Sequence, residues 1–238
     1  KRARPRGKNN RNTGRLRINA MPELRLHDAI FTLRAMRRLK PDPIPVQDLC
    51  DIVEAATMAC SPGNSQPWTF LIITDETQKQ RIATVYREIG IKAIQDGALA
   101  SGLLDDEMEK VYRDALILVD GLGQAPALIL CCVDGHPGEG GIHQSTYYGS
   151  IYPAIQNLML AARARGIGST MTTLHKAREQ DIKNILAIPD HVETIALIPL
   201  GYPQGKWRRP KRKPQREVTF WNVWGERGDS ENSGGWEK

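Results

Sequence analysis

The stretch Cys60-Ser61-Pro62-Gly63-Asn64-Ser65-Gln66-Pro67-Trp68 decides how this chain of 238 residues is interpreted. Its proline, glycine and small polar residues predict a tight turn. The turn leads directly into Trp68 and the apolar, β-branched run 69–74, which predicts a strand. A polar loop at the start of a buried strand is typical of a loop that faces a cofactor.

Two basic clusters accompany this loop. The first is Arg34-Ala35-Met36-Arg37-Arg38, and the second is Arg208-Arg209-Pro210-Lys211-Arg212-Lys213-Pro214. Apolar periodicity predicts a helix over 24–36, so Arg34 and Arg37 would share one face and could converge on one anion. Guanidinium groups suit phosphate and conjugated carbonyl oxygens. A solvated helix end, where the helix dipole favours cations, explains the first cluster equally well.

The positive charge of the chain is concentrated at its N-terminus. The formal net charge is +6, but residues 1–20 contain eight Lys or Arg and no acid, so the remainder carries −2. Few apolar residues and no periodicity predict a disordered leader over 1–20, ahead of Met21. We expect an upstream extension, with a nucleic-acid-binding arm as the distant alternative. Nucleic acid is therefore not the expected partner.

The cysteines and the hydropathy bear on location. Cys50, Cys60, Cys131 and Cys132 show no CxxC spacing, which favours reduced intracellular thiols. No apolar run approaches 18 residues, so we expect no membrane span. The sequence predicts a cytoplasmic protein without a membrane partner.

Periodicity divides the chain into one domain over 21–224 and a polar tail over 225–238. The expected helices are 24–36, 46–56, 76–89, 150–165 and 178–187, the expected strands are 69–74, 127–133, 194–200 and 218–223, and 168–174 is a short strand or loop. Residues 90–124 predict a mobile, mostly helical insertion. Helices and strands interleave without a βαβ repeat, which indicates an α+β fold with a mixed sheet.

Other chemistries find little support in the sequence. There is no GxSxG motif, and Gly121-Leu122-Gly123 lacks the third glycine of a dinucleotide fingerprint. Asp134, His136, Glu139 and His143 match no established metal-ligand spacing and lie in a glycine-rich loop. We predict no metal site.

Five motifs in a fixed order resemble the FMN-dependent nitroreductase family along 24–224. They are Arg34-Ala35-Met36-Arg37, the run 60–68, Ala164-Arg165-Gly166-Ile167-Gly168-Ser169, Gly201-Tyr202-Pro203 and Arg212-Lys213-Pro214. The runs 171–175 and 218–222 resemble an actinobacterial-type branch. The resemblance implies a nitroreductase-like fold, with a central mixed or antiparallel sheet flanked by helices. It also implies a homodimer that exchanges C-terminal segments, with the insertion 90–124 over the active site.

The resemblance also implies roles for individual residues. It marks Arg34, Ala35 and Arg37 as cofactor-binding residues on the ribityl, phosphate and pyrimidine side of FMN, and Arg212 with Lys211 at the phosphate. It places Thr172, Thr173 and Leu174 beside the isoalloxazine ring. Cys60, Ser61 and Asn64 would bind the cofactor from the partner subunit. Three residues depart from the family pattern. Leu33 stands where many relatives have Arg, Ala35 where many have Ser, and Cys60 where Pro is usual. Arg208 or Arg209 would compensate for the missing cation.

The function implied is an FMN-dependent oxidoreductase with NADH or NADPH as reductant. A ping-pong hydride transfer would reduce nitroaromatics, quinones or other small electron-poor acceptors, with the flavin doing the chemistry and no catalytic side chain required. Reductive dehalogenation and flavin-consuming chemistry on the same scaffold remain alternatives.

Overall fold

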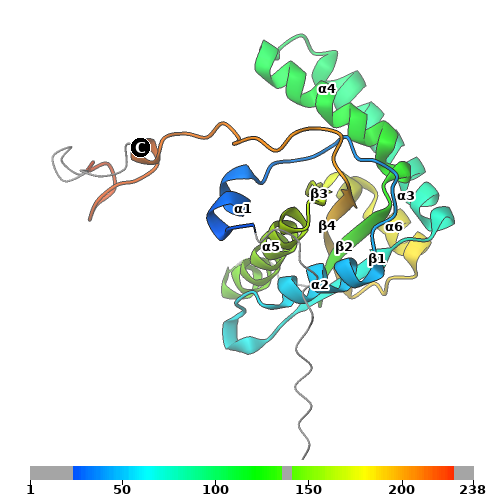
Figure 1. The fold of residues 1–238 in the computed structure, drawn as a ribbon, viewed down its shortest axis with the longest axis horizontal. Helices are drawn as coiled ribbons and strands as arrows, with labels where there is room; N and C mark the ends of the chain where they lie inside the picture. Colours follow the sequence, from blue (N-terminus) through cyan, green and yellow to red (C-terminus); the bar gives the residue numbers. More distant parts are fainter. Residues whose placement is uncertain (1–23, 136–140, 228–238) are drawn as a thin grey trace, which may run out of the picture.

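The computed structural model describes residues 24–135 and 141–227. Its centre is a four-stranded sheet of order β1-β2-β4-β3, made of β1 (Trp68–Ile73), β2 (Ala127–Asp134), β4 (Val192–Gly201) and β3 (Gly168–Ser169). Every neighbouring pair is antiparallel. Helices surround this sheet (Figure 1), which confirms the α+β class. The basic leader, the end of the tail, His136 and Glu139 lie outside the described residues.

The helices are α1 (Leu26–Thr32), α2 (Val46–Thr57), α3 (Glu76–Gly90), α4 (Asp106–Gly121), α5 (Gly141–Ala164) and α6 (Glu179–Leu186). They divide the core into two halves, one on each face of the sheet. Side chains alternate along β2, so Ile129 and Cys131 pack with α2 and α5, while Leu128 and Leu130 pack with α3, α4 and α6. β2 is buried on both faces, which explains its unbroken apolar sequence.

Helix α5 contains most of the helix predicted over 150–165, and one of its faces is buried. Ile151, Ile155, Leu158 and Ala162 are all at most 1% exposed. The helix ends at Ala164, and Gly166 follows with φ of 70°, a left-handed conformation that favours glycine. The N-terminal end differs from the expectation, because α5 begins at Gly141 rather than near 150.

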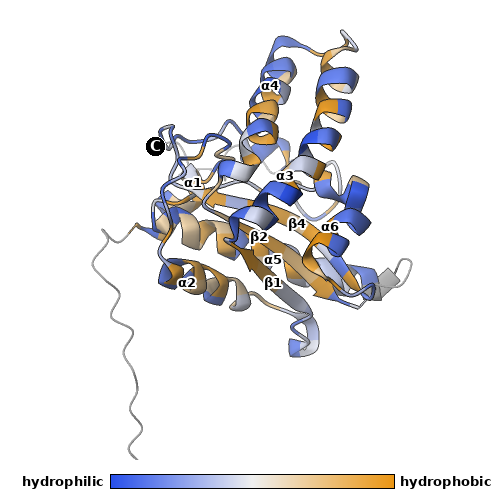
Figure 2. Ribbon diagram, turned by 90° about the vertical axis from the view of Figure 1, so that its right-hand side faces the viewer, coloured by the Kyte–Doolittle hydropathy of each residue, from blue (hydrophilic) through white to orange (hydrophobic). Residues whose placement is uncertain are grey.

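The segment 90–124 is helical, as predicted. α3 continues into the π-helical stretch η2 (Ile91–Leu99), and α4 returns antiparallel to it. The Asp105 carboxylate caps α4 by accepting from Met108 N at 2.8 Å. Figure 2 shows this helical hairpin projecting from the body of the protein.

The predicted helix over 24–36 is wrong in its second half. α1 ends at Thr32, and Leu33 is already extended. Met36 N donates to Ser169 O at 2.9 Å, Lys40 N donates to Tyr202 O at 2.8 Å, and Leu39 forms an antiparallel bridge with Pro203. Pairing with the sheet edge therefore overrides the helical period, and Arg34 and Arg37 lie on an extended segment.

The strand predicted over 218–223 is also wrong. A 3₁₀ turn, η5 (Gln215–Glu217), is followed by irregular backbone, and Val218 and Val223 are exposed. Alternation of apolar residues forms a strand only where a partner offers hydrogen bonds, and among the described residues none pairs with this segment in a ladder.

A buried polar network fixes the turn η4 (Leu174–Arg178) against β4. Thr194 Oγ1 donates to Glu179 Oε1 at 2.9 Å and lies 3.1 Å from His175 Nε2. The Thr194 hydroxyl hydrogen is donated to Glu179, so Thr194 Oγ1 can only accept from His175. His175 therefore carries its hydrogen on Nε2 and donates it to Thr194 Oγ1, which leaves Nδ1 unprotonated. His175 is fully buried, and burial, with the nearby Lys176 ammonium, lowers its pKa to about 4.

We predict that stability falls in mild acid because of His175. The pKa lies near 6.5 when the chain unfolds and near 4 when it is folded, so the unfolded state binds more protons between these values. The free energy of unfolding should therefore drop by up to about 3 kcal/mol between pH 6.5 and 4. Urea unfolding at several pH values measures this. His191→Gln, at an exposed position, should keep the slope, and a His175→Gln slope equal to wild type would contradict the assignment.

Candidate active site

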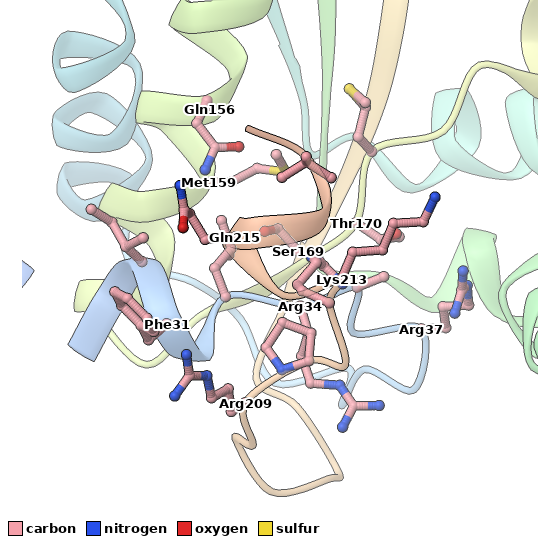
Figure 3. Close-up of a pocket in the computed structure, with 17 residues that line it drawn as sticks. Phe31, Arg34, Arg37, Gln156, Met159, Ser169, Thr170, Arg209, Lys213 and Gln215 are labelled. Atoms are coloured by element: carbon pink, nitrogen blue, oxygen red, sulfur yellow. The ribbon is translucent and has the colours of Figure 1, made fainter. Parts of the chain in front are cut away.

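A cleft of about 690 Å³ opens between α1, the extended segment after it, α5 and the C-terminal arm (Figure 3). We define the arm as residues 203–218. The described residues that line the cleft are Ile30, Phe31, Leu33, Arg34, Ala35, Arg37, Gln156, Met159, Ser169, Thr170, Met171, Arg209, Pro210, Arg212, Lys213, Gln215 and Val218. The lining thus combines apolar side chains with cationic ones.

The cleft is strongly positive. Among the described residues, no carboxylate lines the cleft, and five cations do, which are Arg34, Arg37, Arg209, Arg212 and Lys213. None of the five forms a salt bridge with another described residue, whereas their neighbours Arg38 and Lys211 pair with Asp114 at 3.4 Å and Glu107 at 3.1 Å. Cations that are concentrated in one concave surface without acids create a field that favours an anionic ligand.

The positions of Arg34 and Arg37 are fixed by the close packing of the backbone around them against the sheet. A Cβ on Gly201 would lie 2.9 Å from Leu39 Cβ, and one on Gly168 would lie 3.0 Å from Met36 Cβ. Only glycine at these positions lets the segment 36–40 lie directly on β3 and β4. Met36 is buried at 6% exposure, which anchors the chain between Arg34 and Arg37.

Aromatic stacking fixes the arm on the opposite rim. The Arg163 guanidinium lies 4.1 Å from the centroid of the Trp207 ring, and Arg209 lies 4.7 Å from that of Phe31. Arg163 Nε also donates to Thr32 Oγ1 at 3.0 Å. Cation–π contacts of this kind stabilise by about 0.5–1 kcal/mol each at exposed sites. They hold the arm against α1 and α5, so that Arg209 lies at the cleft.

Ser169 provides a test of whether the cleft suits a polar ligand. Its side chain lines the cleft at 1% exposure, and its Oγ has no hydrogen-bond partner in the described structure. A buried hydroxyl without a partner costs about 1–3 kcal/mol, so such groups are commonly completed by water or a ligand. A phosphorylated, hydroxyl-rich cofactor fits both this group and the cationic lining.

The residues predicted from the sequence divide between the cleft and its surroundings. Arg34, Ala35, Arg37 and Arg212 line the cleft. Lys211 lies beside it and pairs with Glu107 of α4.

The segment 172–174 follows the cleft residue Met171 without lining the cleft itself. Thr172 forms a bridge with Leu197, and its Oγ1 lies 2.7 Å from the hydroxyl of the buried Tyr86. Thr173 and Leu174 lead from this bridge into η4. The structure therefore fixes this segment at the edge of the cleft.

The loop with Cys60, Ser61 and Asn64 lies outside this cleft. Ser61 Oγ accepts from Gln66 N at 3.1 Å, and Asn64 Oδ1 accepts from Gln66 Nε2 at 3.1 Å. Asn64 and Gln66 both have left-handed backbone, with φ of 54° and 47°. Within one chain these polar groups thus stabilise their own turn.

Besides Arg209, which the sequence named with Arg208 as the compensating cation, the cleft has polar or charged lining residues that were not assigned from the sequence, namely Gln156, Ser169, Thr170, Lys213 and Gln215. Lys213 and Arg209 belong to the basic run 208–214, and Arg209 rather than Arg208 lines the cleft. Gln156 carries no sequence signal, because a polar residue on the outer face of a helix is common. Ser169 is the second residue of β3 and Thr170 follows it, and only the packing of this short strand shows that both are buried.

Comparison with known proteins gives the class of the fold and then the family. The solved structure of an iodotyrosine deiodinase bound to FMN and 3-iodo-L-tyrosine has a TM-score of 0.67 and 23% identity, over 84% of this chain and all of that one, which shows a nitroreductase-like fold. The family model for the Nitroreductase family matches residues 32–202. The chain belongs to this family.

For two relatives of known sequence, the match to this chain spans nearly the whole length of the relative. An iodotyrosine deiodinase of Thermotoga neapolitana is 29% identical over 198 residues, or 81% of this chain and 95% of that protein. An NADH dehydrogenase of Thermus thermophilus is 26% identical over 224 residues, or 84% of this chain and 98% of that protein. Among the described residues, no helix combines the length and hydrophobicity needed to cross a membrane.

We predict that Gly201→Ala disturbs both the fold and the cleft. The new methyl group would push against Leu39, Pro126 and the Lys40 carbonyl, and such overpacking costs about 1–3 kcal/mol. Gly205→Ala is the matched control, because its Cβ would meet no atom within 4 Å. Urea unfolding compares the two variants. Equal stability of both would show that the segment 36–40 is not held by close contact at Gly201.

Proposed function

We propose that the protein is an FMN-dependent NAD(P)H oxidoreductase that reduces nitroaromatics, quinones or related electron-poor acceptors. The observation that carries this proposal is a cleft whose described lining has five cations and no carboxylate, in a chain of the Nitroreductase family with a solved relative that binds FMN. FMN, when bound, would accept a hydride from the reduced nicotinamide and pass electrons to the acceptor. The protein binds and orients the reactants.

Different residues of this chain are assigned to different parts of FMN. Arg212 is assigned to the phosphate, because guanidinium groups form forked, charge-assisted hydrogen bonds with phosphate oxygens. Arg34 and Arg37 are assigned to the ribityl and pyrimidine side, where fixed positive charge favours negative charge on the ring. The free Ser169 hydroxyl supplies a further hydrogen-bonding group. The four free thiols support a cytoplasmic location.

The helical hairpin is proposed to cover the entrance of the cleft. Two ion pairs connect α4 to the basic segments, Arg38 with Asp114 and Lys211 with Glu107. Met108 and Val111 on α4 are 42% and 43% exposed, which offers apolar surface to an aromatic acceptor.

The cofactor assignment predicts that Arg212→Gln weakens FMN binding by about 10-fold, because one charge-assisted phosphate contact is lost. Arg216→Gln is the control, since Arg216 lies on the same segment but outside the cleft. Flavin absorbance of the purified protein, followed by titration with FMN after its removal, measures this. Wild-type protein that holds no flavin even after reconstitution would overturn the proposed function.

We further propose a homodimer that exchanges C-terminal segments. Val218, Trp221 and Trp224 are 62%, 61% and 91% exposed, and on α1 Leu26 is 69% exposed. Exposed apolar residues in this number are typical of an association surface. The loop 60–65, which lies outside the cleft of its own chain, would then reach the cofactor of the partner.

The dimer proposal predicts that the double variant Trp221→Ser, Trp224→Ser dissociates at micromolar concentration, because it removes the largest apolar side chains of that surface. Sedimentation velocity measures the mass. Leu103→Ser, at an equally exposed apolar position on the hairpin, should stay dimeric. A monomeric wild-type protein would contradict the proposal.

Reductive dehalogenation is the second candidate, favoured by the deiodinase relatives. The two functions are distinguished by measuring NAD(P)H oxidation with a nitroaromatic and with 3-iodotyrosine. Turnover of 3-iodotyrosine alone would replace nitroreduction by dehalogenation as the proposed function.

A further inference from the structure

Tyr86 of α3 is a buried phenol whose hydroxyl reaches the segment 172–174 at the edge of the cleft. Its side chain is 1% exposed, and its oxygen lies 2.7 Å from Thr172 Oγ1. The hydrogen bond between two hydroxyl groups can run in either direction. No other described residue accepts from Tyr86, so donation by Thr172 would leave the phenolic hydrogen buried without a partner. Because that costs about 1–3 kcal/mol, Tyr86 is the donor.

The Tyr86 hydroxyl keeps its hydrogen at neutral pH. Burial raises the pKa of this phenol above its usual value, while the hydrogen bond with Thr172 and the charge of Arg37 act in the opposite sense. Arg37 lines the cleft, so its effect on the phenol also relates Tyr86 to the cationic side of the site. Tyr86 is therefore a neutral donor near a cleft cation.

Donation by Tyr86 leaves the Thr172 hydroxyl as a donor in its turn. Thr172 Oγ1 accepts from Tyr86 and, over a longer distance of 3.4 Å, from Leu174 N, which uses both lone pairs of the oxygen. Its own hydrogen has no acceptor in the part of the chain that the structure describes. The backbone of Thr172 is held in place, because its N and O both pair with Leu197. A fixed hydroxyl is thus available to an acceptor atom of a ligand.

The surroundings of Thr172 indicate which part of the ligand is near. The residues 169–171 lead into it and line the cleft. Figure 3 shows Thr170 and Arg37 on the side of the cleft away from Phe31. Arg37 is assigned above to the pyrimidine side of FMN, so the ring rather than the phosphate faces this edge. Carbonyl oxygens and unprotonated nitrogens of such a ring accept hydrogen bonds.

We propose that Tyr86 is a positioning residue for the cofactor, because it holds the Thr172 hydroxyl as a hydrogen-bond donor to an acceptor atom of the flavin ring. The inference rests on the proposed function and adds a residue that does not itself touch the cofactor. A hydrogen bond strengthens when its acceptor gains negative charge. The donor therefore favours the reduced, electron-rich ring and raises its reduction potential.

The reduction potential of bound FMN, measured against a reference dye, tests the proposal. Thr172→Val removes the donor, and Tyr86→Phe releases it from its fixed orientation. Each should lower the affinity for reduced relative to oxidised FMN, by up to about 5- to 10-fold, the difference between a charge-assisted and a neutral hydrogen bond. For a two-electron couple this is a potential about 20–30 mV lower. Tyr112→Phe is the matched control, because Tyr112 packs in the same half of the core and its hydroxyl bonds to no described residue.

A double variant distinguishes positioning from packing. If Tyr86 acts through Thr172, Tyr86→Phe lowers the potential of the wild type and has no further effect in Thr172→Val. Thr172→Ser keeps the hydroxyl and should keep the wild-type potential. A Tyr86→Phe protein with lower stability to urea but an unchanged potential would overturn the proposal. Additive shifts in the double variant, or a Thr172→Ser potential as low as that of Thr172→Val, would also overturn it.

The measurement keeps this inference separate from the proposed function. It uses FMN-loaded protein and no electron acceptor, so it does not depend on which acceptor is reduced. Unchanged potentials in every variant of a protein that holds FMN would overturn the role of Tyr86 and leave the oxidoreductase intact. Wild-type protein that holds no FMN after reconstitution would overturn the proposed function itself.

Discussion

The architecture of the cleft depends on one close contact, the packing of the extended segment 36–40 onto the ends of β3 and β4. Gly168 and Gly201 leave room for Met36 and Leu39, and the backbone hydrogen bonds of Met36 and Lys40 fix the register. The same segment also receives the arm, because Gln204 N donates to Arg38 O at 3.0 Å. Both cationic rims of the cleft are therefore positioned from one edge of the sheet.

The positive charge of the cleft depends on which basic residues form ion pairs as well as on how many there are. Arg38 and Lys211 lie next to cleft cations in the sequence, yet each pairs with an acid of α4. Exposed ion pairs of this kind contribute about 0–1 kcal/mol, so they add little to stability. Their effect is on orientation: they neutralise the cations outside the cleft and leave those inside free for an anion.

The sequence predicts the elements whose signal is local or periodic. β2, β4 and α5 follow from unbroken or helical apolar patterns, because burial of those side chains is what forms the elements. The end of α1 could not be predicted in this way. Its helical period continues past Thr32, but pairing of Met36 with Ser169 competes successfully, and that partner is 133 positions away in the chain.

The cleft was predictable to a similar extent. Arg34, Arg37 and Arg212 were found from residue type and from motif order, even though Arg34 and Arg37 lie on extended backbone rather than on a helix. Within the basic run 208–213, the sequence does not distinguish the side chains that enter the cleft. Stacking on Phe31 decides that Arg209 does, and the ion pair with Glu107 keeps Lys211 outside.

The arm and the residues directly after it carry two separate features of the molecule. The arm supplies Arg209, Arg212 and Lys213 to the cleft, and the residues after it expose Trp221 and Trp224. In the proposed dimer, ordering of this segment by an anion in the cleft would reduce the entropy that association must still remove from it. By linkage, formation of that dimer would strengthen anion binding by the same factor. A cofactor with its phosphate at the arm and a partner on the tryptophans would therefore bind cooperatively, without any movement of the sheet.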